Sequence, residues 1–273
     1  MASTAMNYIH PRRIVILIRK EWAELYRNTM LLGTVLFMPL LFTVIPILML
    51  WSMGGAGDVM GDSMGPFSGM QLSMCGSLSS GECAMAVFLA QFNIMFMFIP
   101  IILPATITPY AIVGEKTQRS LEPLLATPIS TLDLLLAKAL SAIIPATLAT
   151  WLAFFIYMIA SWFLLANRAV FAIVFHPQWL FAILVVGPLL ALLTADLALM
   201  VSARSTEPRA AQQVAGLVVL PLVLLLMGQM SGILLLTPAL TFILGLVVLI
   251  LAVILTYLAV KAFDREAILT RWA

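Results

Sequence analysis

The sequence predicts an all-α membrane protein with six transmembrane helices. Of its 273 residues, 63% are hydrophobic and only 10% are charged, whereas soluble domains have roughly 45–50% apolar and about 25% charged residues. The apolar residues form long runs that match the roughly 20 helical residues needed to cross a bilayer. Backbone amides in lipid have no water to bond, so a spanning chain must be a helix or a closed β-barrel. Continuous apolar runs lack the two-residue alternation of barrel strands, so we expect helices.

Six apolar runs are long enough to span, and we place them at residues 30–51, 84–113, 134–166, 178–201, 213–236 and 239–260. The expected segments are an N-terminal region, one transmembrane domain and a C-terminal tail, at 1–29, 30–260 and 261–273. With a cytoplasmic N-terminus, only Arg168 of the 14 Lys and Arg residues falls outside, as the positive-inside rule requires. We therefore expect a multi-pass cell-membrane protein with cytoplasmic N- and C-termini.

The segment from His10 to Asn28 predicts an amphipathic helix at the cytoplasmic interface. Ile14, Ile18 and Trp22 recur at helical spacing, while basic side chains occupy another face and can meet anionic lipid. The basic residues are too dispersed for a cleavable signal peptide, so we expect this segment in the mature protein. It is either a membrane anchor or a lever moved by a cytoplasmic partner, and its interfacial residues are Arg12, Arg13, Arg19, Lys20, Trp22 and Arg27.

Residues 52–83 predict the main external loop, because they are rich in Gly, Ser and Met and contain no cation. Cys75 and Cys83 both lie in it. In an oxidising compartment these two thiols either form a disulfide or remain unpaired near the membrane surface.

Residues 114–133 predict a cytoplasmic loop that mixes acids, bases and leucines and has Pro123 and Pro128 as breaks. Leu121, Leu124 and Leu125 are too few to form a membrane span, so outside the bilayer their side chains must be buried against another surface. That surface belongs either to the neighbouring helices or to a docking partner. The third span begins near Leu132, and we expect its first turns to project into the cytoplasm beside this loop.

Prolines occur inside five of the six predicted spans, at Pro39, Pro46, Pro100, Pro104, Pro109, Pro145, Pro188 and Pro221. Each removes a backbone hydrogen bond, so these helices are expected to bend. The bends indicate irregular packing or a moving gate.

Three groups of residues together resemble the permeases of the ABC-2 family, over nearly the whole chain. They are Arg19, Lys20, Glu21 and Trp22; then Glu115, Lys116, Ser120, Leu121, Glu122, Leu124, Leu125, Pro128 and Lys138; then Ala203, Arg204, Pro208, Arg209, Ala210, Ala211, Gln212, Gln213 and Pro221. The chain departs from that family at Ser120 and Ala137, where the family often has glycine.

The resemblance implies a permease subunit of an ABC exporter. In that family the N-terminal helix and the loop between spans two and three contact a separate ATPase subunit, and two permease chains pair as a homodimer or with a related permease. The residues that it assigns to coupling are Glu115, Lys116, Leu121, Glu122, Leu124, Leu125 and Pro128.

This chain is not expected to be an enzyme, because it contains no G-x-x-x-x-G-K-[ST] phosphate loop. ATP and Mg²⁺ would then bind the partner subunit, and no cofactor or nucleic acid is expected on this one. The apolar spans suit a hydrophobic or amphipathic cargo, whose identity the residues leave open.

A few polar residues fall within the predicted spans and are candidates to line a pathway or to bond helices to one another: Gln91, Asn93, Asp196, Gln229 and Ser231. A stand-alone secondary transporter or channel would need more such groups. An intramembrane enzyme is disfavoured because Ser231 does not lie in a G-x-S-x-G motif and both histidines lie outside the spans. No metal-binding motif is present.

Overall fold

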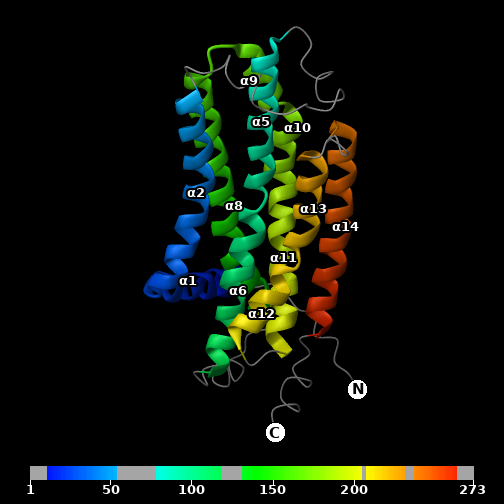
Figure 1. Cartoon of the computed structure of the whole chain (residues 1–273). Helices are drawn as coiled ribbons and strands as arrows, with labels where there is room; N and C mark the ends of the chain where they lie inside the picture. Colours follow the sequence, from blue (N-terminus) through cyan, green and yellow to red (C-terminus); the bar gives the residue numbers. More distant parts are fainter. Residues whose placement is uncertain (1–10, 54–77, 118–130, 205–206, 231–236, 263–273) are drawn as a thin grey trace, which may run out of the picture.

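The computed structural model describes residues 11–53, 78–117, 131–204, 207–230 and 237–262, and within these ranges every regular element is helical. The elements are α1 (Pro11–Arg27), α2 (Thr29–Met53), α5 (Ser80–Phe96), α6 (Ile99–Thr117), α8 (Thr131–Leu164), α9 (Arg168–Val174), α10 (Pro177–Phe181), the π-helix η1 (Ala182–Val186), α11 (Gly187–Arg204), α12 (Pro208–Gly216), α13 (Val219–Met230) and α14 (Pro238–Ala262). Most stand side by side in an upright bundle, and α1 lies across its lower end (Figure 1). The predicted all-α class is confirmed.

Five segments of the described chain are long and apolar enough to cross a membrane: Leu31–Ser52, Gly81–Tyr110, Leu132–Leu164, Arg168–Ser202 and Pro238–Lys261. Each overlaps a predicted span. The predicted span 213–236 has no counterpart among them, because its described part divides between α12 and α13. A shorter apolar stretch, Arg209–Leu225, lies there instead.

Three interruptions of the helices lie two or three residues before a proline in the next helix. The gap between α5 and α6 precedes Pro100, η1 precedes Pro188, and the gap between α12 and α13 precedes Pro221. Proline offers no N–H to the carbonyl four residues earlier and its ring clashes with that carbonyl, so the regular helix is lost there. The other prolines predicted to bend a span stay inside continuous helices: Pro39, Pro46, Pro104, Pro109 and Pro145.

The π-helical turn η1 is completed by a side chain from another helix. The amide of Gly187 donates to the carbonyl of Ala182, five residues earlier. The next bond of this pattern would join Pro188 to Ile183, and Pro188 has no N–H to give. Instead, the indole Nε1 of Trp151 in α8 donates to the Ile183 carbonyl at 3.2 Å. Trp151 therefore ties α8 to the interrupted helix.

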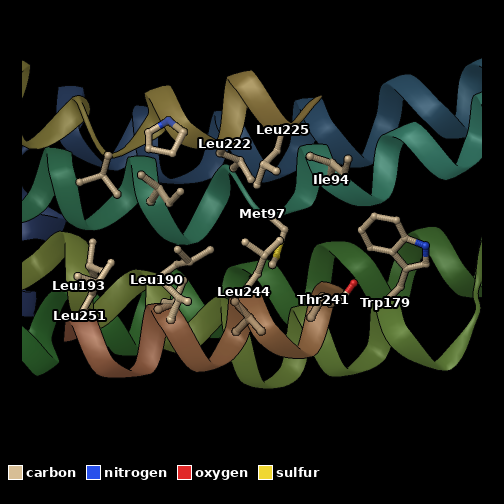
Figure 2. Close-up of a pocket in the computed structure, with 17 residues that line it drawn as sticks. Ile94, Met97, Trp179, Leu190, Leu193, Leu222, Leu225, Thr241, Leu244 and Leu251 are labelled. Atoms are coloured by element: carbon tan, nitrogen blue, oxygen red, sulfur yellow. The ribbon is translucent and has the colours of Figure 1, made fainter. Parts of the chain in front are cut away.

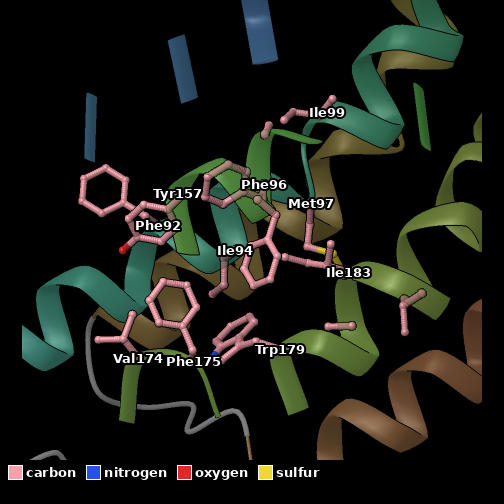
Figure 3. Close-up of a cluster of buried hydrophobic side chains, with 14 of the residues drawn as sticks. Phe92, Ile94, Phe96, Met97, Ile99, Tyr157, Val174, Phe175, Trp179 and Ile183 are labelled. Atoms are coloured by element: carbon pink, nitrogen blue, oxygen red, sulfur yellow. The ribbon is translucent and has the colours of Figure 1, made fainter. Parts of the chain in front are cut away.

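An aromatic core fixes α5, α8 and the segment after α9 to one another in the upper half of the bundle (Figure 3). The ring centroid of Phe96 lies 5.4 Å from that of Tyr157 and 5.7 Å from that of Phe154. The ring centroids of Phe175 and Tyr157 are 5.2 Å apart. The Tyr157 hydroxyl donates to the carbonyl of Leu89 at 3.3 Å. Edge-to-face and offset pairs of this kind add to the free energy gained by burial.

The end of the bundle opposite α1 is closed by hydrogen bonds between helix caps. Ser79 and Glu82 form a capping box at the start of α5. Asn167, the N-cap of α9, donates its Nδ2 proton to Glu82 Oε1 at 2.7 Å. Cys83 is 3% exposed and disulfide-bonded, and Cys75 lies outside the described residues.

Candidate coupling site at the junction of α1 and α8

The apolar face of α1 packs against the start of α8. Ile14, Leu17 and Ile18 are buried and cluster with Leu134 and Ala137 of α8. The segment predicted as an amphipathic helix is therefore helical, and α8 of the same chain covers part of its apolar face.

A buried ion pair reinforces this junction. Lys138 Nζ lies 3.0 Å from Glu21 Oε1, and the side chains are only 3% and 7% exposed. One turn further along α8, the carbonyl of Ser141 accepts a hydrogen bond from Trp22 Nε1 at 3.0 Å. A buried charge that loses its partner is costly, so the pair fixes how α1 is placed on α8.

The helix that receives α1 runs through the whole bundle. α8 has 34 residues, which span about 51 Å at 1.5 Å per residue, well beyond the roughly 30 Å of bilayer hydrocarbon. It packs on α2, α6 and α11 as well as α1. Its first turn holds the fully buried Asp133, where a carboxylate complements the helix dipole. A displacement of α1 would therefore act directly on the main helices of the bundle.

The helices on either side of the predicted coupling loop end near this junction. α6 ends at Thr117 and α8 begins at Thr131, both at the lower end of the bundle, near α1 (Figure 1). Glu115 and Lys116 lie in the last turn of α6. The remaining coupling candidates, Leu121, Glu122, Leu124, Leu125 and Pro128, lie outside the described residues.

The basic residues of α1 surround the packed face. Arg12, Arg19 and Arg27 are exposed, whereas Arg13, Lys20 and Trp22 are partly buried. Lys20 Nζ lies 3.3 Å from Glu24 Oε1, one turn away on the same helix. The basic side chains thus remain at least partly on the surface, while Ile14, Leu17 and Ile18 contact α8.

Two of the five polar candidates within the spans bond different pairs of helices. Asn93 of α5 is fully buried, and its Nδ2 donates to the Val174 carbonyl at 2.6 Å. Asp196 of α11 accepts a hydrogen bond from Thr256 of α14. The Oε1 atom of Gln91 is buried with no hydrogen-bond partner among the described residues. The side chain of Gln229 and all of Ser231 lie outside the described part of the chain.

Sequence reasoning did not pair Glu21 with Lys138. Glu21 falls on the same face of α1 as the buried Ile14, Leu17 and Ile18, and an acid on an apolar face is the signal that would have identified it. Lys138 is likewise enclosed by apolar residues near the start of a predicted span. Within the described ranges, no group of three or more His, Cys, Asp or Glu side chains is arranged to hold a metal.

The apolar helices, their lengths and the buried charges at one end define an integral membrane protein with several spans. The chain matches the ABC-2 family transporter protein family over residues 15–259 and belongs to it. A search of curated proteins found no match. Membership in this family makes the chain a membrane subunit of an ABC transporter and implies an ABC ATPase as its partner.

Proposed function

We propose that the chain is the permease subunit of an ABC exporter in the cell membrane, coupled to a separate ATP-hydrolysing subunit through the loop between its second and third spans. ATP and Mg²⁺ bind that subunit, and two permease chains pair to form the translocation pathway. The observation that carries the coupling role is the junction of α1 and α8, where a buried ion pair joins two elements next to the loop.

The course of the chain supports six spans. α1 and the C-terminal end of α14 lie at the same end of the bundle (Figure 1), and a chain returns to its starting side only after an even number of crossings. The five long apolar segments are an odd number. The segment built from α12 and α13 supplies the sixth crossing, interrupted before Pro221.

The charge distribution supports a cytoplasmic lower end. Exposed cations of α1, together with Lys261 at the end of α14, lie at that end, while Arg168 lies at the start of α9 on the opposite end (Figure 1). This is the asymmetry that the positive-inside rule describes. The Arg168 guanidinium lies 3.9 Å from the Trp162 ring centroid, and aromatic residues are common at membrane interfaces.

The surface of α1 supports an interfacial position for this helix. Val15, Ile16 and Tyr26 are 49%, 66% and 65% exposed. Exposed apolar side chains beside the exposed arginines 12, 19 and 27 suit a helix that lies in the plane of the interface.

Co-purification tests the coupling role. The chain carrying Leu121→Glu, Leu124→Glu and Leu125→Glu should lose a soluble ATPase that co-purifies with the wild type. Substitution of the same leucines by Met keeps the apolar surface and should retain the ATPase. Transport by the isolated chain in vesicles without nucleotide would contradict the proposal and favour a stand-alone transporter or channel.

A further inference from the structure

An elongated apolar cavity of about 270 Å³ lies inside the bundle, between α5, α6, α10, η1, α11, α13 and α14 (Figure 2). We call it the α13–α14 slot. Among its lining residues, only Trp179 and Thr241 carry a side-chain nitrogen or oxygen. The Thr241 hydroxyl donates to the carbonyl of Thr237, the residue that precedes α14. A buried water needs two to four polar partners, so the slot beyond Trp179 and Thr241 offers a water no partner.

The slot lies where the three interruptions of the helices meet. Met97 lies in the gap between α5 and α6, Val186 ends η1, and Val218 lies in the gap between α12 and α13, and all three line the slot. Where a helix is interrupted, its side chains do not fill the space against the neighbouring helix as those of a regular helix do. The prolines that follow these interruptions are therefore the sequence feature that keeps the slot open.

The slot has the length of one leaflet. Along α14 it extends from Thr241 to Leu251, about 15 Å at 1.5 Å per residue, which is half of the roughly 30 Å of hydrocarbon. Trp179 and Thr241 lie at one end, and Leu193 and Leu251 lie at the other (Figure 2). The amphipathic residues Trp179 and Thr241 thus lie at the end of the slot nearer the start of α14. The opposite end, at Leu193 and Leu251, is lined by aliphatic residues.

The size of the slot favours a single hydrocarbon chain. Pockets for drug-sized molecules are about 300–1,000 Å³, and an apolar cavity of about 150 Å³ stays dry and takes up benzene. The outer side of α14 faces the lipid of the bilayer, because its apolar residues Ile243 and Leu246 are 55% and 50% exposed. Within the described residues, α14 packs chiefly on α11 and has little contact with α13, so we place the entrance of the slot between α13 and α14.

We propose that the α13–α14 slot holds one acyl chain of a membrane lipid, whose head group lies at the level of Trp179 and Thr241. This inference goes beyond the proposed function and does not depend on the ATPase. Only the assignment to the outer leaflet rests on the proposed topology, in which the start of α14 faces outward.

Photo-crosslinking of the full chain in lipid nanodiscs tests the proposal without nucleotide or ATPase, so its result and that of the coupling experiment are independent. The probe is a phosphatidylcholine with a diazirine placed either near the ester or near the end of one acyl chain. The first probe should label Trp179 and Thr241, and the second should label Leu193 and Leu251. Labels confined to outward residues such as Ile243 and Leu246, or the same labels with both probes, would overturn the proposal.

A matched pair of substitutions gives a second readout. Leu222→Trp places an indole in the slot, whereas Leu224→Trp places it on a side chain that is 60% exposed on the same helix. Leu222→Trp should lose both the slot labels and the lipid that remains on the purified chain in native mass spectrometry, and Leu224→Trp should retain both. Equal lipid retention by a folded Leu222→Trp chain would contradict the proposal, and the wild-type label map decides the matter if that variant does not fold.

Discussion

Lys138 Nζ lies 3.0 Å from Glu21 Oε1, which joins α8 to α1 across 117 residues of sequence inside an apolar contact. Both side chains are almost completely buried. Their neighbours are the leucine and isoleucine side chains that hold α1 against α8. The pair therefore makes the position of α1 specific, since sliding or rotating the helix would separate two buried opposite charges.

Lys138→Met should destabilise the protein strongly, because Glu21 would remain buried without this cation. The expected cost is about 3–5 kcal/mol in the free energy of unfolding, the usual range for removing one partner of a buried pair. Thermal or denaturant unfolding in detergent measures it. Lys261→Met, at an exposed lysine at the end of α14, is the control and should change stability by less than about 0.5 kcal/mol.

Replacing both charges separates the two contributions to the junction. Glu21→Leu combined with Lys138→Met should recover most of the stability lost in the single variant, because two apolar side chains leave no uncompensated charge. If the double variant is as unstable as Lys138→Met alone, the apolar contact of α1 with α8 does not hold the helix in place.

Trp151→Phe should weaken the attachment of α8 to η1. Phenylalanine keeps most of the ring but cannot donate to the Ile183 carbonyl, and an unsatisfied buried acceptor costs about 1–3 kcal/mol. Denaturant unfolding compares it with Trp51→Phe, at a tryptophan that is 73% exposed. Similar small effects of both changes would mean that the Ile183 carbonyl finds another donor.

Gly245→Ala should push α14 away from η1. A Cβ atom at this position would lie 3.0 Å from Val186 Cγ2 and 3.4 Å from Phe181 Cε1, and overpacking of this kind costs about 1–3 kcal/mol. Gly33→Ala in α2 is the control, since no atom lies within 4 Å of its Cβ. That control should be neutral or gain up to about 1 kcal/mol from helix propensity. A stabilised Gly245→Ala variant would show that Val186 moves aside readily.

In the denatured protein, where its burial no longer matters, Cys83 should resist maleimide labelling until it is reduced, because its sulfur is disulfide-bonded. We predict Cys75 as its partner, as the sequence contains two cysteines. Cys75→Ser should then make Cys83 reactive without reduction, as measured by a mass shift after alkylation. A covalent dimer of the wild type on a non-reducing gel would instead indicate a bond between chains.

The sequence by itself determined that the chain lies in a lipid bilayer and that its fold is all-α. Long runs of apolar residues without charge, such as those in α2 and α14, are stable only in the hydrocarbon of a bilayer. In hydrocarbon, the backbone N–H and C=O groups of each span must form hydrogen bonds within that span, which requires a helix. Local chemistry also predicted α1 from its spacing, and the effect of Pro100, Pro188 and Pro221 from their missing N–H groups.

Only the tertiary structure decided which prolines interrupt a helix, because Pro39 and Pro145 have the same local chemistry and remain inside continuous helices. It also decided that Glu21 meets Lys138 and that the interrupted helices enclose one slot. These relationships join residues far apart in the chain, and they depend on how side chains from several helices fill a shared volume. Hydrophobic patterning is local and carries no information about which faces meet.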